Sequence, residues 1–322
     1  MSTTPTCLVL SMNLLNWGMY GPVAPAKVRA VVDVVRASRP LVLCLSEVGP
    51  DDAVAQLTGP LSEQGLVYEV ASVGTSNKRG IRNAILTLRG VEVLEPKLAM
   101  PLELTIPPID LESFQMGGMR LRLSREPLGV LVRAHGLVVA VGFFHPKSKY
   151  LEDFRNGDGV SQAPHQTFLG LCKMMSSLRN FGQCMLAREF VDRFSELNPT
   201  KAEWGVSERD IRFVLAGDWN ANPQEEQRQA LGGYIDGGLT AETLLHDVIG
   251  GLSTDLAQVC TIRWAGNPSS FDAIYVDART REHTFARIVP VDLVDLFGLP
   301  PEERDRVENE TLDHCPVGLF LE

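Results

Sequence analysis

The stretch Val214-Leu215-Ala216-Gly217-Asp218-Trp219-Asn220 is an apolar run that ends in a glycine and two polar residues. A short run this apolar is typical of a buried strand. Asp and Asn add nothing to such a strand, because each must lose its hydration on burial. Their position next to Gly217 therefore indicates a polar site at the edge of a sheet. Asp218 and Asn220 are two residues apart, so on an extended chain both side chains point to the same side.

Short apolar runs and amphipathic segments alternate along the rest of the chain. The runs predict strands at residues 6–12, 41–45, 67–73, 83–88, 91–95, 119–123, 128–134, 137–144, 213–216, 273–276, 284–289 and 317–321. Helical periodicity predicts helices over 25–36 and over 164–197, the second interrupted near 180–182. Residues 101–110, 146–165 and 301–310 are expected to be loops. The strand, helix and strand at the amino end predict α/β packing there. Later strands that follow one another this closely usually pair antiparallel.

The size and composition of the chain set broad limits on its class. It has 322 residues, of which 44% are hydrophobic and 22% charged, the balance of an ordinary globular protein. We expect residues 1–322 to form a single domain. The net charge of −10 argues against a protein that holds nucleic acid by bulk attraction. Two basic runs, 76–89 and 116–135, are either a local path for a polyanion or ordinary solvated faces.

The six cysteines, at positions 7, 44, 172, 184, 260 and 315, form no C-x-x-C pair. This spacing is not that of a small disulfide-stabilised domain, and we expect reduced, mostly buried thiols. The first twenty residues lack the pattern of a signal peptide, and no run approaches 18 apolar residues. These features predict a cytoplasmic protein without membrane insertion. They leave its oligomeric state open.

Polar or titratable residues stand at the ends of several predicted strands. These positions are Asn13, Glu47, His145, Asp218 with Asn220, Asp272, and Asp313 with His314. Each has an ordinary alternative when taken alone, such as a strand-ending turn, a solvated end or a structural histidine. Taken together they offer oxygen ligands that suit Mg²⁺ or Mn²⁺, and histidines that can exchange protons. The set indicates metal-assisted cleavage of a phosphate ester.

Seven segments, in this order along the chain, resemble the endonuclease/exonuclease/phosphatase superfamily, whose best-known member is deoxyribonuclease I. They are Ser11-Met12-Asn13, Leu45-Ser46-Glu47-Val48, Arg125-Glu126-Pro127-Leu128, Phe144-His145-Pro146-Lys147-Ser148-Lys149, Gly217-Asp218-Trp219-Asn220, Ser270-Phe271-Asp272-Ala273-Ile274 and Asp313-His314-Cys315-Pro316-Val317. The resemblance runs nearly end to end. It implies a four-layer α/β/β/α sandwich of two mainly antiparallel sheets with outer helices. Two positions depart from the family pattern, since Ser46 stands where Gln is usual and Leu312 where Ser is usual.

The resemblance also implies roles for the polar residues. Glu47, with Asn13 and Asp313, would hold the divalent metal. Asp218 would orient or deprotonate the attacking water, and Asn220 would hold the water or the phosphate. His145 would bind phosphoryl oxygens, while His314, held by Asp272, would act as general acid or base.

Three basic residues are candidates for phosphate contacts, namely Arg125, Lys147 and Arg188. Solvent exposure is the alternative for Lys147. For Arg188 the alternative is an ion pair within its helix, with an acid such as Glu189 or Asp192.

The activity implied is that of a phosphodiesterase dependent on Mg²⁺ or Mn²⁺, most simply a nuclease that hydrolyses DNA. A small phosphate ester, such as a nucleotide, sugar or lipid headgroup, is the alternative substrate. Salt dependence of the rate separates the two, because binding of a polyanion releases counterions. A third possibility is a catalytically silent binding protein, but the full set of titratable residues argues against it.

Overall fold

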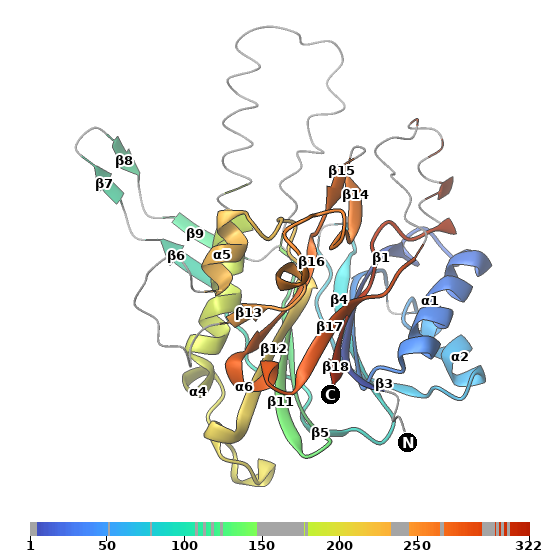
Figure 1. Cartoon of the computed structure of the whole chain (residues 1–322), viewed down its shortest axis with the longest axis horizontal. Helices are drawn as coiled ribbons and strands as arrows, with labels where there is room; N and C mark the ends of the chain where they lie inside the picture. The colour runs from blue at the N-terminus through green and yellow to red at the C-terminus, as the bar shows by residue number, and fades with distance from the viewer. Residues whose placement is uncertain are drawn as a thin grey trace, which may run out of the picture.

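Two six-stranded sheets pack face to face in the computed structural model of the chain (Figure 1). The first sheet has the order β17 (Thr284–Ile288), β18 (Val317–Leu321), β1 (Thr6–Trp17), β2 (Val42–Val48), β4 (Arg82–Leu88) and β3 (Tyr68–Val73). The second has the order β13 (Leu245–Asp247), β16 (Asp272–Asp277), β12 (Ile211–Asp218), β11 (Leu137–Phe144), β10 (Leu128–Ala134) and β5 (Glu92–Glu95). One neighbouring pair in each sheet is parallel, β1 with β2 and β11 with β12, and the other neighbours are antiparallel.

The structure describes residues 5–50, 52–77, 79–106, 109–111, 114–116, 119–122, 125–146, 177, 180–232, 245–264, 267–291, 300, 303, 306, 307 and 310–322. The predicted loop 146–165 and the first part of the predicted helix 164–197 fall almost wholly outside these residues. So does most of the predicted loop 301–310.

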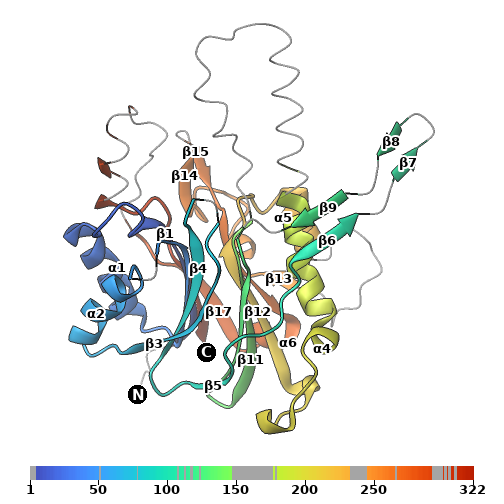
Figure 2. The same ribbon diagram turned by 180° about the vertical axis from the view of Figure 1, so that it is seen from behind.

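Helices cover the outer face of both sheets (Figures 1 and 2). On the first sheet these are α1 (Pro25–Ser38) and α2 (Ala55–Glu63). On the second they are a helix over residues 180–192, α4 (Phe194–Leu197) and α5 (Glu226–Gly232). The short α6 (Ala278–Arg281) connects β16 to β17. The arrangement confirms the expected four-layer α/β/β/α sandwich.

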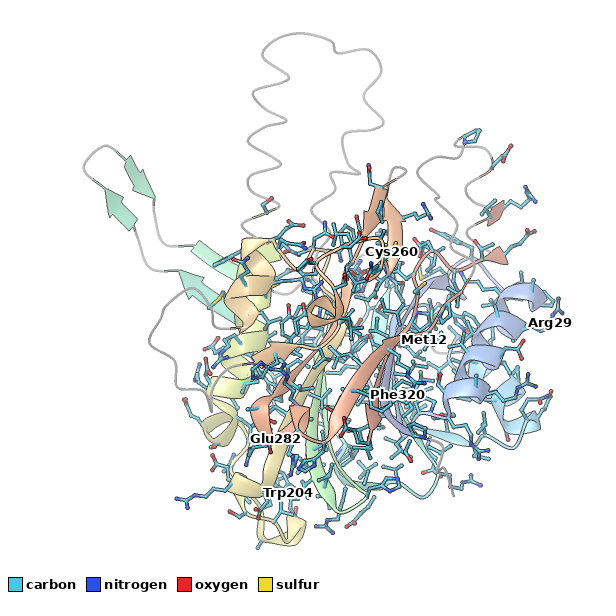
Figure 3. The ribbon with its side chains drawn as sticks, viewed as in Figure 1. Met12, Arg29, Trp204, Cys260, Glu282 and Phe320 are labelled. Carbon is cyan, nitrogen blue, oxygen red and sulfur yellow. The ribbon has the colours of Figure 1, made fainter. Side chains whose placement is uncertain are left out.

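The main core lies between the two sheets, where apolar side chains fill the space (Figure 3). Phe213 on β12 packs instead against the outer helices, with its ring edge-on to those of Phe190 and Phe194. Because side chains alternate along a strand, the next residues on the opposite face, Val214 and Ala216, point toward the first sheet. Asp218 follows on that same face and so reaches the junction of the two sheets.

The first two strands run further than the sequence predicts. β1 continues past residue 12 to Trp17, and β2 continues past residue 45 to Val48, so Asn13 and Glu47 lie within strands. The pairing between β1 and β2 shifts register between Asn13 and Trp17. Leu15 and Glu47 adopt positive φ angles of 47° and 59°. Such irregularities let a strand continue past residues that normally end one.

Two further predictions about secondary structure are wrong. The expected loop 101–110 contains β6 (Glu103–Ile106) and the start of β7 (Ile109–Leu111), because its prolines flank the strands without interrupting them. These strands pair with β9 (Met119–Arg122) and β8 (Phe114–Met116), forming an arm that projects from the body (Figure 1). Residues 180–182, expected to interrupt a helix, lie within the helix over 180–192.

Gly217 allows the close pairing of β11 and β12, and its replacement by alanine is expected to destabilise the fold. A Cβ at this position would overlap the carbonyl oxygen of Phe144 on β11. We expect Gly217→Ala to lower the free energy of unfolding by about 1–3 kcal/mol, as for other overpacked sites. Urea unfolding followed by circular dichroism measures the change. The control is Gly59→Ala, since Gly59 has open space around it; equal stability of the two variants would contradict the prediction.

Candidate active site

Strand pairing brings the predicted site residues together at one end of the sheets. In the parallel pair β11–β12, Phe144 is the partner of Gly217, so the next residues, His145 and Asp218, are neighbours. In the antiparallel pair β12–β16, Asp218 is the direct partner of Asp272. Residues 54 to 127 positions apart in the chain therefore share one small polar region, which lies at the end of the sandwich marked by Cys260 in Figure 3.

Asp218 is the centre of this region. Its Oδ2 accepts a hydrogen bond from Asn13 Nδ2 at 3.1 Å and lies 3.4 Å from His145 Nε2 and 3.9 Å from His314 Nε2. Its Oδ1 accepts from the backbone N–H of Asn220 at 3.0 Å. Burial alone would raise the pKa of Asp218, but the two histidines and this N–H together hold it below its usual value. Asp218 is therefore an anion at neutral pH, surrounded by donors.

Asp272 orients His314. The two side chains are joined by a hydrogen bond of 2.6 Å between His314 Nδ1 and Asp272 Oδ2. Asp272 is itself held through its backbone N–H, which donates to Thr261 Oγ1 at 3.1 Å. Burial alone would lower the pKa of His314, but the carboxylates around it raise the value well above normal. These are Asp272, Asp313 and Asp218. His314 is therefore a fixed cation whose Nε2 faces Asp218.

Glu47 approaches the same region from the first sheet. Its Oε2 accepts a hydrogen bond from the backbone N–H of Asn16 at 3.3 Å, and its Oε1 lies 3.8 Å from both Arg125 Nη2 and His145 Nε2. Burial would raise the pKa of Glu47, but its electrostatic interactions with His145 and with the guanidinium of Arg125 outweigh this effect and leave the pKa lowered. Glu47 has a positive φ of 59°, as Asn220 has of 53°. Such backbone angles cost free energy and gather at functional sites.

His145 differs from His314 in charge. Burial and the positive charge of Arg125 lower the pKa of His145, so its imidazole is neutral at neutral pH. Its Nε2 faces Asp218 and Glu47, while its buried Nδ1 has no hydrogen-bond partner among the described residues. The site thus pairs one neutral and one cationic histidine across a single carboxylate. This arrangement separates their chemical roles.

The donor set fits a divalent cation near Glu47 and Asp313. Asp313 Oδ1 is buried, lies 3.9 Å from His314 Nε2 and has no hydrogen-bond partner among the described residues, which is costly unless something else satisfies it. Carboxylate oxygens are the ligands that Mg²⁺ and Mn²⁺ prefer. A second group, Asp218, Asp272 and His314, also has ligand atoms within 4.8 Å of one another. The hydrogen bond to Asp272 and the raised pKa of His314 make that group a better proton pair than a metal site.

The affinity for the metal is expected to depend on pH through Asp313. Burial raises the pKa of this carboxyl to about 6, so it holds a proton below that pH and the proton competes with the metal. We expect Mn²⁺ to bind tightly above about pH 6 and roughly tenfold more weakly for each pH unit below it. Isothermal titration with MnCl₂ at a series of pH values measures the effect. Equal affinity at about pH 5 and about pH 7.5 would count against Asp313 as a ligand.

The remaining predicted residues have different surroundings. Asn13 uses both polar atoms in hydrogen bonds, since its Oδ1 also accepts from the N–H of Leu15 at 2.9 Å. The side chain of Asn220 donates to the carbonyl of Pro146 at 3.1 Å. Their parts in binding metal or phosphate stay predictions.

The three basic candidates for phosphate contacts also differ in their surroundings. Arg125 lies in the site, where it donates to the carbonyl oxygens of His145 and Pro146 at 3.4 and 3.5 Å. Arg188 pairs with Asp192 in its own helix, with N–O distances of 2.9 and 2.6 Å, which is the alternative that the sequence left open. Lys147 lies outside the described residues.

Two residues that the sequence analysis did not single out support the site. Lys27 on α1 is 2% exposed and donates to the carbonyl of Leu15 at 2.7 Å, beside the strand that carries Asn13. Its spacing of four residues from Val31 and eight from Val35 places a charge on the apolar face of a helix, a signal that could have been read. Thr261, which holds Asp272, lies in a segment without any such signal.

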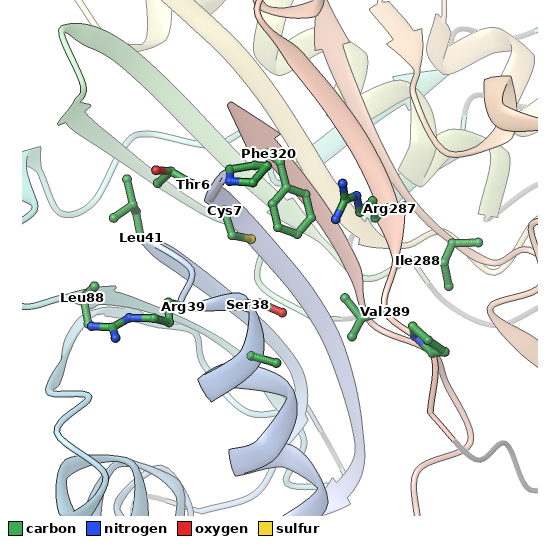
Figure 4. Close-up of a pocket in the computed structure, with 13 residues that line it drawn as sticks. Thr6, Cys7, Ser38, Arg39, Leu41, Leu88, Arg287, Ile288, Val289 and Phe320 are labelled. Atoms are coloured by element: carbon green, nitrogen blue, oxygen red, sulfur yellow. The ribbon is translucent and has the colours of Figure 1, made fainter. Parts of the chain in front are cut away.

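A cavity of about 490 Å³ lies elsewhere, between the end of α1 and strands β1, β17 and β18 (Figure 4). Its lining includes Arg39, Arg287 and Phe320 but none of the residues described above. Arg39 stands at the C-terminal end of α1, where a cation complements the helix dipole. The cavity therefore has no evident part in the chemistry of the site.

Among the described residues, no helix is long and apolar enough to cross a membrane. The described cysteines, Cys7, Cys44, Cys184, Cys260 and Cys315, are all free thiols, as expected.

Comparison by sequence finds no matching family model and no significant match among curated proteins. Comparison by structure finds many similar folds. TDP2 from D. rerio, complexed with single strand DNA product, matches with a TM-score of 0.52 and 16% identity over 99% of this chain and 100% of that one. The human Nocturnin catalytic domain, with bound sulfate anion, matches with a TM-score of 0.51 and 14% identity over 98% and 94%. An endonuclease/exonuclease/phosphatase family protein from Bacteroides thetaiotaomicron matches with a TM-score of 0.50 and 12% identity over 99% and 100%.

Structural matches at sequence identities this low establish the fold of the chain but not its activity. Each match covers nearly the whole length of both chains, so the likeness concerns the entire sandwich and not a shared substructure. The chain has the fold of the endonuclease/exonuclease/phosphatase superfamily, as its resemblance in sequence predicted.

Proposed function

We propose that the protein is a divalent-metal-dependent phosphodiesterase. The observation that carries the proposal is the position of Asp218, with His145 Nε2 at 3.4 Å on one side and His314 Nε2 at 3.9 Å on the other. Hydrolysis of a phosphate ester needs a group that orients water and groups that stabilise the growing charge on the phosphoryl oxygens. Asp218, an anion, supplies the group that orients water, and the neutral His145 and the cationic His314 supply the groups that stabilise charge.

Each side chain has a task that follows from its charge. Asp218 accepts a hydrogen bond from the attacking water and holds the water in line with phosphorus. His314, a cation oriented by Asp272, donates from Nε2 to the group on which negative charge develops. His145, which is neutral, donates from Nε2 to a phosphoryl oxygen. The buried position of all three strengthens these interactions, because the local dielectric is low.

Glu47 and Asp313 are the residues proposed to hold Mg²⁺ or Mn²⁺, with Asn13 beside them. A bound divalent ion would neutralise charge on the phosphate and stabilise the leaving oxygen. Asn220 fixes Asp218 through its backbone N–H and ties the segment to Pro146 through its side chain. Arg125 donates to the same Pro146 carbonyl, so it supports the segment that contains His145 and is also placed to contact phosphate.

DNA is the substrate that we propose. The D. rerio structure of TDP2 contains a single strand DNA product and that of Nocturnin a sulfate anion, a mimic of phosphate, on the same fold. The chain itself carries a net charge of −10, which favours the alternative, a small phosphate ester bound without a broad basic surface. The salt dependence of the rate distinguishes the two substrates, because only with a polyanion should the rate fall steeply as the ionic strength rises.

Nicking of supercoiled plasmid tests the proposal. The parent protein is incubated with Mg²⁺ or Mn²⁺, with and without chelator, beside His314→Ala and the control His283→Ala. His283 is exposed and lies outside the site, so its loss should change nothing. We expect chelator-sensitive nicking that His314→Ala abolishes. Cleavage of bis-p-nitrophenyl phosphate without nicking would support a small ester instead, and activity unaffected by both chelator and His314→Ala would refute the proposal.

A further inference from the structure

Arg228 is a charged residue buried behind the candidate active site. It belongs to α5, on the outer face of the second sheet, and its residue exposure is 2%. Burying a guanidinium is costly unless its donors are satisfied. The contacts that satisfy Arg228 are therefore informative about why a charge is kept there.

One nitrogen of Arg228 joins the two segments that carry the proposed catalytic groups. Nη1 donates to the carbonyl of Ala221 at 3.3 Å and to the carbonyl of Ser270 at 2.5 Å. Ala221 directly follows Asn220, and Ser270 stands two residues before Asp272. Beside this junction, the N–H of Ser270 donates to Asn222 Oδ1 at 2.9 Å. Arg228, on the outer face of the second sheet, thus fixes the spacing between the Asp218 segment and the Asp272 segment.

The other nitrogens of Arg228 anchor it to the body of the sheet. Nε donates to the hydroxyl of Tyr275 at 2.9 Å, and Nη2 forms an ion pair with Asp247 Oδ2. Asp247 is itself fixed, because its Oδ1 accepts from the N–H groups of Ile249 and Gly250 at 3.2 and 2.7 Å. The guanidinium therefore cannot shift without breaking several buried contacts. Its planar fork of donors suits this task, which an ammonium would not perform in the same way.

We propose that Arg228 is a positioning residue for the reaction. It holds the Asp218 segment against the Asp272 segment and, through Asp272, sets where His314 Nε2 points. The catalytic part of this inference rests on the proposed phosphodiesterase activity, while its structural part does not. Arg228 itself does not touch the site, so it acts only through the carbonyls that it binds.

Kinetics of Arg228→Lys test the catalytic part. Lysine keeps the charge but cannot reach both carbonyls, Tyr275 and Asp247 together. Per folded molecule, we expect kcat to fall about 10- to 100-fold while KM changes by less than about threefold, the range seen when supporting residues of a site are removed. Tyr275→Phe is a milder second variant that removes one anchor and keeps the ring, with an expected loss of about threefold on the same basis. It keeps the test informative if Arg228→Lys fails to fold.

The matched control is Arg133→Met. Arg133 also bridges a carboxylate and a carbonyl, those of Glu92 and Trp204, but at the far end of the same sheet, where Trp204 is labelled in Figure 3. A purely structural role for Arg228 would give both arginine variants lower stability and an unchanged kcat per folded molecule. That result would overturn the proposal.

A second measurement does not depend on any activity. The imidazole ¹H–¹⁵N spectrum of His314 reports its hydrogen bond to Asp272. We expect the His314 Nδ1 resonance to shift in Arg228→Lys and Tyr275→Phe and to stay in place in Arg133→Met. If the parent protein cleaves no phosphate ester but these shifts occur, the proposed function fails and the positioning role stands. Unchanged His314 resonances in both Arg228→Lys and Tyr275→Phe would overturn the positioning role.

Discussion

Asp218→Asn is expected to lower kcat by about 10³-fold, within the range for loss of a group that handles the reacting proton or water. Asparagine keeps the size of the side chain and can still accept a hydrogen bond from Asn13. It cannot carry the negative charge that stands between His145 and His314 at 3.4 and 3.9 Å. Without that charge, the water loses its strongest acceptor and the histidines lose the partner that fixes their charge states.

Initial rates on plasmid and on bis-p-nitrophenyl phosphate measure this effect, with circular dichroism to confirm that the variant is folded. Asp277→Asn is the matched control. Asp277 is also a buried aspartate, on the same sheet, where it accepts hydrogen bonds from the N–H groups of Thr280 and Phe213 at 2.7 and 3.1 Å. Its replacement should cost stability and leave kcat per folded molecule near that of the parent. Asp218→Asn activity within about tenfold of the parent would rule out the assigned role.

Glu47→Gln is expected to remove the response to metal. The amide keeps an oxygen for the N–H of Asn16 but loses the charge that a divalent cation needs. Metal stabilisation of a phosphoryl transition state is worth several kcal/mol, so we expect the rate to fall by roughly 100-fold or more at any Mg²⁺ concentration. Mn²⁺ binding, followed by electron paramagnetic resonance, should be lost in parallel.

The control for this variant is Glu92→Gln. Glu92 is a half-exposed glutamate that pairs with Arg133 away from the site. Mn²⁺ affinity that is the same in Glu47→Gln and in Glu92→Gln would exclude Glu47 as a ligand. That result would favour the cluster of Asp218, Asp272 and His314 as the metal site, since it is the other described group that could hold an ion.

The resemblance to the superfamily predicted the four layers and most of the residues that meet at the site, whereas local patterns alone predicted strands, helices and polar positions at strand ends. Asp218 illustrates why: it follows an apolar strand in period two, so its side and its place at the strand end were both determined locally. The ends of β1 and β2 were not predictable in this way. Glu47 continues its strand with a positive φ, and its carboxylate contacts Asn16, His145 and Arg125, which belong to other segments of the chain.

Residues that support the site through contacts distant in sequence could not be identified from local sequence patterns either. Thr261 holds Asp272 from 11 positions away, and Arg228 reaches Ser270 across 42. Neither has a pattern around it that distinguishes it from an ordinary polar residue. Their roles depend on tertiary packing, which periodicity and motif spacing do not report.

Neither sheet holds a complete site. Asn13 and Glu47 belong to the first sheet, while Asp218 and Asp272 belong to the second, and the 3.1 Å hydrogen bond from Asn13 to Asp218 crosses between them. A slip of the sheets past each other by a fraction of a residue would separate these groups while leaving every strand intact. Under mild denaturant or pressure, inactivation should therefore precede the loss of secondary structure, because catalysis depends on sheet alignment and the circular dichroism signal does not.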